Sequence, residues 1–214
     1  MRLVVIAKEC LPGRVKTRLT PPLSPVEAAS LAFVSLQQTL DTVRAVDVHE
    51  RVLLLDGEPD DLDTRGFHIE AQVGGGLDER IAVAFDARSS PVLLIGMDTP
   101  QVSLGMLQSV VDDEVSDAWF GPATDGGFWA LGLREPRGDL VRGVAMSRAD
   151  TGEVQLRRLR RAGLGVRRLP ALTDVDRIED AVAVAHVSAG SPFAAAVRSL
   201  GLLARSPQAV SAGR

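Results

Sequence analysis

Four cationic side chains crowd into a short stretch near the start of the chain, directly after its first apolar run. The stretch reads AKECLPGRVKTRL, spans residues 7–19, and carries Lys8, Arg14, Lys16 and Arg18. Arginine offers a flat fork of N–H donors that suits phosphate oxygens, and lysine offers a mobile point charge. Gly13 lets the backbone approach a ligand, although the stretch contains neither the GxxxxGK[ST] nor the GxGxxG fingerprint. The cations predict a di- or triphosphate site; the alternative is a solvated turn whose charges balance nearby acids.

An aspartate follows another apolar run. Asp98 lies within GMDTP, residues 96–100, before a helix candidate that begins near Ser103. Mg²⁺ commonly takes one or two protein carboxylates and fills its remaining positions with water and phosphate oxygens. Asp98 is therefore a candidate metal ligand, and the alternative is an aspartate that caps the turn before Pro100 through its side chain.

A third stretch combines an aspartate with paired glycines. Residues 120–129 read FGPATDGGFW and place Asp125, Gly126 and Gly127 between two strand candidates. An Asp-Gly pair commonly closes a hairpin, and glycine also permits a ligand to lie against the backbone. The stretch predicts a hairpin turn, with the wall of a ligand pocket as the alternative, and at least one of Phe128 and Trp129 is expected in the core.

Acids gather again near residue 175. Asp174 and Asp176 precede a helix candidate, and Glu179 and Asp180 fall in its first turn. Acids in a first turn stabilise the helix dipole, which accounts for the later two but not for the earlier two. Either Asp174 or Asp176 is therefore a candidate second carboxylate for an ion held by Asp98.

The elements that must position these clusters follow from hydrophobic periodicity. The strand candidates are residues 3–7, 51–55, 67–71, 92–96, 118–121, 128–133 and 165–169. The helix candidates are residues 24–45, 77–87, 103–114, 151–162 and 177–186. This alternation predicts an α/β fold of three layers with a mainly parallel central sheet and helices on both faces. Ligands of such sheets bind beyond the carboxyl ends of the strands, which is where the four clusters fall.

The chain is expected to form one domain over residues 1–187, followed by a C-terminal helix and tail over residues 188–214. Ser24 with Glu27 forms a capping-box pattern, and Pro25 suits the first position of the helix that follows. Near the end, residues 193–204 are a candidate closing helix, and the last residues are expected to fray.

Composition narrows the classes of partner. The 214 residues are 45% hydrophobic, 24% charged and only 4% aromatic, with a formal net charge of -4. Such a chain has no overall basic field for nucleic acid or an anionic membrane, and few aromatic platforms for single strands. It contains no apolar run of transmembrane length, and its single Cys10 fits a reducing compartment, so a cytoplasmic protein is expected.

Other chemistry has little support in the sequence. The three histidines, His49, His68 and His186, are scattered, so a zinc site is not expected. A cysteine in a loop is more often a bystander than a nucleophile. The arginine-rich run at residues 157–161 could suggest a nucleic-acid patch, but on an acidic protein it is interpreted as a solvated helix face.

Taken together, the four clusters resemble the glycosyltransferase A (GT-A) superfamily of nucleotide-diphospho-sugar transferases, in particular a bacterial family of glycosyltransferase-like proteins. The family pattern reads AKxPxPGxVKTRL, GxDxP, GPAxDGGY and a DVDTxxDL-like segment. The corresponding stretches here are AKECLPGRVKTRL, GMDTP, GPATDGGFWALGL and LTDVDRIEDA. The resemblance spans about residues 2–185 and implies a Rossmann-like GT-A fold, while it says little about the substrate.

The layout is also similar to small nucleotidyltransferases, including 2-phospho-L-lactate guanylyltransferase and molybdenum cofactor guanylyltransferase. The resemblance implies a phosphate-binding group made of Lys8, Gly13, Arg14, Lys16 and Arg18. It implies a pocket for acceptor or nucleotide lined by Asp125, Gly126 and Gly127. It implies Mg²⁺ or Mn²⁺ held by Asp98 and Asp176. The residues expected to carry catalysis are Lys16, Arg18, Asp98 and Asp125.

The chain departs from the family pattern at three places. Cys10 replaces a proline, Phe128 replaces a tyrosine, and Arg177 with Ile178 replaces a Thr-Pro pair. The first two keep size or apolar character, whereas Arg177 alters the surroundings of the second metal ligand. In the segment before the arginine-bearing helix, Ser147 and Thr151 are candidates for acceptor contacts, with a helix N-cap as the simpler reading of Thr151.

These features favour transfer of a nucleotidyl group from a nucleoside triphosphate to a small phosphorylated acceptor. In that reaction pyrophosphate leaves, and a basic loop would stabilise it. The alternative is a glycosyltransferase that uses a nucleotide sugar, with Asp125 as the base for an acceptor hydroxyl. A third hypothesis is a nucleotide-binding protein without turnover. The sequence does not identify the acceptor molecule or the base of the nucleotide, and it leaves open whether two copies of the chain pair.

Overall fold

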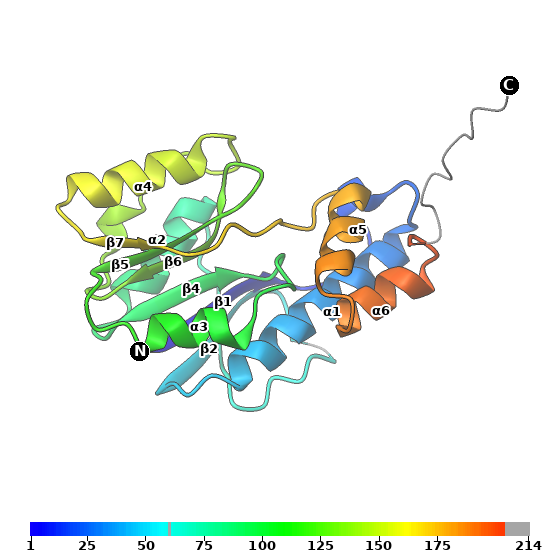
Figure 1. Ribbon diagram of the computed structural model, residues 1–214, viewed down its shortest axis with the longest axis horizontal. Helices are drawn as coiled ribbons and strands as arrows, with labels where there is room; N and C mark the ends of the chain where they lie inside the picture. The colour runs from blue at the N-terminus through cyan, green and yellow to red at the C-terminus, as the bar shows by residue number, and fades with distance from the viewer. Residues whose placement is uncertain (60, 204–214) are drawn as a thin grey trace, which may run out of the picture.

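A computed structural model describes residues 1–59 and 61–203 of the chain (Figure 1). It contains a seven-stranded sheet in the order β3-β2-β1-β4-β6-β5-β7. The strands are β1 (Arg2–Lys8), β2 (Glu50–Asp56), β3 (His68–Ala71), β4 (Val92–Gly96), β5 (Ala118–Pro122), β6 (Phe128–Leu133) and β7 (Val166–Arg168). β6 runs antiparallel to its neighbours β4 and β5, and the other neighbouring pairs are parallel. The mainly parallel sheet is confirmed, with one reversed strand in its middle.

The helices are α1 (Pro25–Arg44), α2 (Leu77–Asp86), α3 (Leu104–Val111), α4 (Thr151–Arg161), α5 (Ile178–Val187) and α6 (Pro192–Ser199), with short 3-10 turns at Thr17–Leu19 and Gly138–Leu140. α3 ends earlier than the pattern predicts because Asp113 accepts hydrogen bonds from the backbone N–H groups of Val115 and Ser116. The closing helix also ends earlier, at Ser199, and the last residues of the chain, which are expected to fray, lie outside the described residues. Within the described residues, no helix is long and apolar enough to cross a membrane.

The start of α1 follows its sequence signature. The Ser24 hydroxyl accepts a hydrogen bond from the Glu27 backbone N–H at 3.3 Å, and the Glu27 carboxylate accepts one from the Ser24 backbone N–H at 2.8 Å. The capping box is therefore confirmed, and it satisfies two backbone donors that a helix end leaves without partners.

Alternation along the strands separates two hydrophobic cores on opposite faces of the sheet. Leu3, Val5 and Ala7 of β1 belong to the core shared with α1 and α3. Val4 belongs to the core shared with α2 and α4, because successive side chains of a strand point to opposite faces. This arrangement confirms the three-layer α/β fold.

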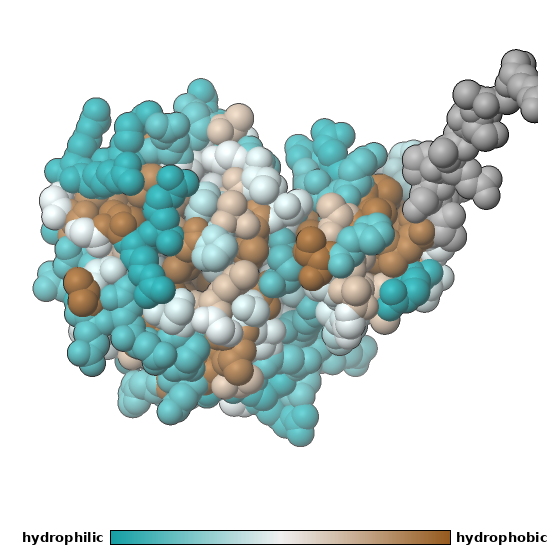
Figure 2. Space-filling view, viewed as in Figure 1, coloured by the Kyte–Doolittle hydropathy of each residue, from teal (hydrophilic) through white to brown (hydrophobic). Residues whose placement is uncertain are grey.

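A third cluster lies beside the sheet rather than under it. It joins the first half of α1 to α5 and α6, with Phe193 fully buried among them. Figure 1 shows α5 and α6 packed near one end of α1, away from α4, and the segment after β7 crossing between the two parts. In the space-filling view the surface is hollowed between them (Figure 2), and hydrophilic residues cover α4. Arg157, Arg160 and Arg161 are exposed there, as a solvated helix face requires.

Candidate functional site

Long-range backbone hydrogen bonds bring the sequence clusters together at one edge of the sheet. β1, β4 and β5 end at this edge, and the segment at residues 169–176, here called the strap, runs along it after β7. The strap pairs with the turn after β5, where Thr124 N–H donates to the Leu172 carbonyl at 2.9 Å. It also pairs with the turn after β4, where Val175 N–H donates to the Asp98 carbonyl at 2.9 Å. Because the strap holds both turns, its aspartates lie beside Asp98.

Lys16 of the opening loop reaches the aspartate that follows β4. Its Nζ lies 2.6 Å from Oδ1 of Asp98, with 9% of the lysine side chain exposed and 42% of the aspartate. Lys16 has φ 49° and ψ 36°, a left-handed backbone that turns the loop toward the short 3-10 turn at Thr17–Leu19. The loop thus presents an ammonium, largely shielded from water, to a half-exposed carboxylate.

Arg18 makes a second link to the strap. One of its terminal nitrogens lies 2.5 Å from Oδ2 of Asp176, and 67% and 43% of the two side chains are exposed. The Asp180 carboxylate accepts a hydrogen bond from Arg177 N–H at 2.8 Å. Asp180 therefore serves the start of α5, as the first-turn interpretation predicts, and Asp176 faces Arg18 and solvent.

Asp174 of the strap has a raised pKa. Burial raises the pKa of its carboxyl from 3.8 to about 7. Neighbouring negative charges act in the same direction, and Lys16 opposes them; the neighbours are Asp98, Asp125 and Asp176. The residues alone left the choice between Asp174 and Asp176 open, and the resemblance implied Asp176; in the structure both are partly buried, Asp176 pairs with Arg18, and Asp174 carries the raised pKa.

The hairpin expected around the Asp-Gly pair is present between β5 and β6. Asp125 is exposed, and its Oδ1 accepts a hydrogen bond from Gly127 N–H at 2.8 Å. Gly126 has φ 92°, and a Cβ added there would lie 2.0 Å from the carbonyl oxygen of Ala149, so the turn can pack against the start of α4 only with glycine. Trp129 is 2% exposed and belongs to the core.

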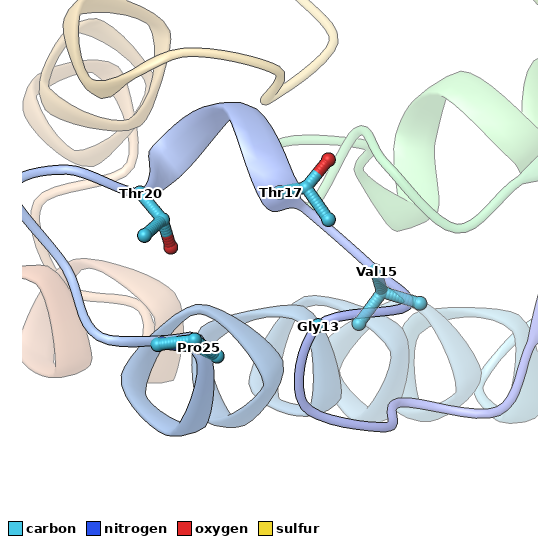
Figure 3. A pocket seen from close by; sticks show the side chains of 5 residues that line it. All are labelled: Gly13, Val15, Thr17, Thr20 and Pro25. Atoms are coloured by element: carbon cyan, nitrogen blue, oxygen red, sulfur yellow. The ribbon is translucent and has the colours of Figure 1, made fainter.

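The remaining members of the predicted phosphate group are Lys8, the last residue of β1, and Gly13 and Arg14 of the loop that follows. Lys8, Gly13 and Arg14 are exposed, and Gly13 has φ 75°. In residues 1–59 and 61–203, neither Lys8 nor Arg14 forms an ion pair. A pocket of about 140 Å³ lies between this loop and the start of α1. Figure 3 shows the residues that line it, which are Gly13, Val15, Thr17, Thr20 and Pro25.

The donor set at this edge consists of carboxylates rather than imidazoles or thiols. Among the described residues, no group of three or more His, Cys, Asp or Glu side chains is arranged to hold a metal ion. Asp98 and Asp174 nevertheless lie close enough for one charge to raise the pKa of the other group. Two hard oxygen ligands in proximity fit Mg²⁺ or Mn²⁺ that takes its other ligands from water and phosphate.

Two further expectations concern Cys10 and Thr151. Burial, followed by the charge of Asp98, raises the pKa of the Cys10 thiol to about 12, so the thiol stays protonated and Cys10 is not an activated nucleophile.

Thr151 is the first residue of α4 rather than its N-cap, which is Asp150. Its buried hydroxyl donates to the Ala145 carbonyl at 2.8 Å and holds the preceding segment. Ser147 has φ 58° in that segment, and an acceptor contact for it stays a prediction.

Two residues at this edge of the sheet were not predicted from the sequence as part of the site. Gln101 Nε2 donates to the Thr173 carbonyl at 2.7 Å and fastens the strap. The Thr99 hydroxyl is buried next to Asp98 and has no hydrogen-bond partner within the part of the chain that the structure describes. Thr99 lies within the Gly-x-Asp-x-Pro stretch and Gln101 directly follows it, and that proximity is the one hint that residue spacing could offer.

Comparisons with known proteins agree with this architecture. A family model described as "Uncharacterized protein conserved in bacteria (DUF2064)" matches residues 39–148, just over half of the chain. A search of the curated proteins finds no match.

Among solved structures, the chain is similar to a "putative nucleotide-diphospho-sugar transferase" from Desulfovibrio desulfuricans G20, with a TM-score of 0.84, 27% identity, and coverage of 95% of this chain and 96% of that one. It shares its fold with a nucleotidyl transferase from Methanothermobacter thermautotroptrophicus, with a TM-score of 0.58, 15% identity, and coverage of 86% and 95%. It also shares its fold with CMP:2-keto-3-deoxy-manno-octonic acid synthetase complexed with CTP, with a TM-score of 0.53, 13% identity, and coverage of 88% and 98%. These similarities identify the fold as GT-A-like.

Proposed function

Because the chain belongs to the DUF2064 family of uncharacterized bacterial proteins and has a GT-A-like fold, we propose that it is a nucleotide-dependent transferase. In its preferred reaction, a nucleotidyl group passes from a nucleoside triphosphate to a small phosphorylated acceptor, and a divalent cation is required. The two similar proteins of the GT-A-like fold described as a nucleotidyl transferase and as a synthetase complexed with CTP support this class of reaction.

The observation that carries the proposal is the meeting of the opening loop with Asp98. Lys16 Nζ lies 2.6 Å from Asp98 Oδ1 at the carboxyl edge of the parallel strands, where ligands of such sheets bind. Arg14 and Arg18 are further exposed cations of this loop, and Lys8 is exposed at the end of β1 directly before it. A triphosphate needs this combination, because its oxygens require donors from the protein and its charge requires cations.

In the proposed reaction an acceptor phosphate oxygen attacks the α-phosphorus. The bond from the α-phosphorus to the bridging oxygen breaks, and pyrophosphate leaves with the bonding electrons. Lys16, Arg14 and Arg18 would hold the departing phosphates and neutralise the charge that builds on them. No covalent nucleophile is needed, in keeping with the protonated thiol of Cys10.

The divalent cation would be held by Asp98, with Asp174 as the second carboxylate in preference to Asp176. When bound, Mg²⁺ or Mn²⁺ supplies positive charge between the phosphates. Lys16 would then exchange its contact with Asp98 for one with a phosphate. Asp176 would stay with Arg18 at the rim of the site.

A second candidate reaction is glycosyl transfer from a nucleotide sugar. It draws support from the Desulfovibrio protein, whose name describes a nucleotide-diphospho-sugar transferase and whose TM-score is 0.84. Asp125 is the carboxylate available as base for an acceptor hydroxyl, because it is exposed at the tip of the hairpin. The same Lys16 and Arg18 would then hold the leaving nucleoside diphosphate.

A thermal-shift screen of the wild-type protein tests the proposal. Nucleoside triphosphates and nucleotide sugars are added with and without Mg²⁺, because a ligand that binds only the folded state raises Tm. We expect a Mg²⁺-dependent rise with a triphosphate, and no such rise in Asp98→Ala. A rise confined to nucleotide sugars would favour glycosyl transfer, and no rise with either would contradict a nucleotide site.

A further inference from the structure

The sheet ends at β3, and the outer edge of this strand is open. β3 pairs with β2, and no other segment of the described part of the chain pairs with it. His68, Ile69 and Ala71 of the strand are exposed, and Glu70 is partly buried. An edge strand of this kind presents backbone donors and acceptors that can pair with another strand.

The backbone groups that face outward follow from the hydrogen bonds to β2. Gln72 N–H donates to the Leu55 carbonyl of β2 at 3.0 Å. Alternate residues of an edge strand bond to its one neighbour, so Glu70, like Gln72, directs its N–H and C=O groups toward β2. The N–H and C=O groups of Ile69 and Ala71 therefore point away from the sheet.

Exposed apolar side chains concentrate on this strand and directly after it. Ile69 is 47% exposed, Val73 is 39% exposed and Leu77 is 44% exposed. They are three of the seven large apolar side chains that the described part of the chain leaves exposed, and all three fall within residues 69–77. Such a concentration is typical of a surface that contacts another protein.

One face of β3 carries a histidine and a glutamate. The register with β2 pairs Glu70 with Leu54, whose side chain belongs to the core shared with α2 and α4. On this face Arg88 donates to Glu70 Oε2 at 2.6 Å, and 43% of the glutamate side chain stays exposed. His68 is exposed and shares the face, because it lies two residues before Glu70. Ile69 points to the opposite face.

We infer that β3 pairs with the β3 strand of a second copy of the chain, antiparallel and with the two-fold axis at Ile69. In this register Ile69 lies opposite Ile69 of the second copy, and the two residues exchange N–H···O hydrogen bonds through their outward backbone groups. On the other face, His68 of each copy lies opposite Glu70 of the other. The two sheets then form one continuous sheet. The inference goes beyond the proposed reaction and does not depend on it.

Charge distinguishes this register from its neighbours. An axis at Glu70 would place the two Glu70 carboxylates directly opposite one another, and like charges in that position are destabilising. An axis at Ala71 would place Glu70 opposite Gln72, whose side-chain amide already donates to carbonyls of β1 and β2. Of these three axes, the one at Ile69 alone gives each glutamate a side chain that can donate to it. A second copy supplies this match twice, once for each strand.

Sedimentation velocity over a range of protein concentrations tests the pairing. We expect the wild type to form dimers, and Ile69→Lys to weaken dimer formation at least tenfold, because two ammonium groups would meet at the axis. Lysine is common on edge strands, and circular dichroism checks that the variant folds.

Val115→Lys is the matched control, because Val115 is 91% exposed and lies outside β3, between α3 and β5. It should form dimers as readily as the wild type. A wild type that stays monomeric at every concentration would overturn the inference, and so would an equal loss in Ile69→Lys and Val115→Lys.

Two substitutions at His68 test the register in opposite directions. His68→Lys should strengthen dimer formation about three- to tenfold, and His68→Glu should weaken it by a similar factor, because residue 68 faces Glu70 of the second copy. His186→Glu is the control for the change of charge, because His186 is exposed in α5, and it should leave dimer formation unchanged. Equal effects of lysine and glutamate at position 68 would overturn the axis at Ile69.

A cysteine at the axis measures the same register directly. In a Cys10→Ser background, Ile69→Cys should form a disulfide between two copies on mild oxidation, because residues opposite one another in a hydrogen-bonded pair have Cα atoms about 5.5 Å apart. Ala71→Cys is the matched control, because an axis at Ile69 separates the two copies of residue 71 by roughly 14 Å. Any result other than a disulfide in Ile69→Cys alone would overturn the axis at Ile69.

Discussion

The opening loop makes two ion pairs, two residues apart, that differ in how much water reaches them. Lys16 is 9% exposed in its pair with Asp98, whereas Arg18 is 67% exposed in its pair with Asp176. Exposed pairs contribute about 0–1 kcal/mol to stability, because solvent and salt screen them and because holding two long side chains in one geometry costs conformational entropy. Water and salt screen the pair of Lys16 with Asp98 less, because little of the lysine side chain is exposed. We call Lys16 with Asp98 the inner pair and Arg18 with Asp176 the outer pair. The difference in exposure teaches that the inner pair dominates the electrostatics of the site, whereas the outer pair mainly orders the rim of the site.

The inner pair also sits in a more crowded field of charge. Asp174 lies close enough to Asp98 and Asp125 for their charges to raise its pKa, and Lys16 is the cation that opposes them. Without a bound ligand, Lys16 therefore balances carboxylates that would otherwise repel one another. Asp176 of the outer pair also raises the pKa of Asp174, as the last of the charges that act on it.

The largest expected effect is on nucleotide binding by the inner cation. Lys16→Met should lower the affinity for the Mg²⁺ complex of a nucleoside triphosphate roughly 10- to 100-fold, because charged hydrogen bonds to phosphate are lost. Isothermal titration calorimetry measures the change, and circular dichroism checks the fold. Arg18→Met is the matched substitution at the outer pair, and we expect a loss below about tenfold. Equal losses in the two variants would remove the distinction between the pairs.

The next effect concerns stability and pH at Asp174 of the strap. The folded protein keeps a proton on Asp174 between pH 3.8 and about pH 7, where the unfolded chain has released it. Stability therefore falls as pH rises through this range, and the full penalty is present above pH 7. Asp174→Asn should raise the free energy of unfolding at pH 8 by on the order of 2 kcal/mol, and the gain should vanish near pH 4.

Urea unfolding at the two pH values, in buffer free of divalent cations, measures this gain. Asp176→Asn is the control at the outer pair, where we expect a change of less than about 1 kcal/mol at either pH. A loss of stability in Asp174→Asn at pH 8 would show that the Asp174 charge is favourable in the folded state, contrary to the raised pKa of its carboxyl.

The smallest effect has the opposite sign to the first. Lys16→Met should strengthen the binding of Mn²⁺ alone by about three- to tenfold, because Asp98 no longer has an ammonium beside it. A titration followed by the electron paramagnetic resonance signal of free Mn²⁺ measures this affinity without any nucleotide. Arg18→Met should leave the Mn²⁺ affinity unchanged. Weaker Mn²⁺ binding in Lys16→Met would argue against the exchange of partners at Asp98.

Local patterns were sufficient for most of the fold. The seven strand candidates and six helix candidates all appear, with shifts of a few residues at their ends. A capping box, a glycine after an aspartate or an alternating run acts within a few residues, so its outcome can be predicted from them alone. The place of β6, antiparallel between β4 and β5, could not be predicted from such patterns, because strand order depends on pairing between distant segments.

The sequence by itself determined that cations and acids would gather at one edge, since each cluster directly follows a strand and parallel strands share an edge. Only the tertiary structure decided which side chains meet there. The hydrogen bond from Val175 N–H to the Asp98 carbonyl brings the strap beside Asp98, and Asp176 of the strap pairs with Arg18. Likewise, Glu9, Phe33 and Glu58 form one pocket because β1 and β2 are neighbours under α1. Residue types are local properties, whereas burial and charge neighbours arise from contacts that the chain makes over long separations.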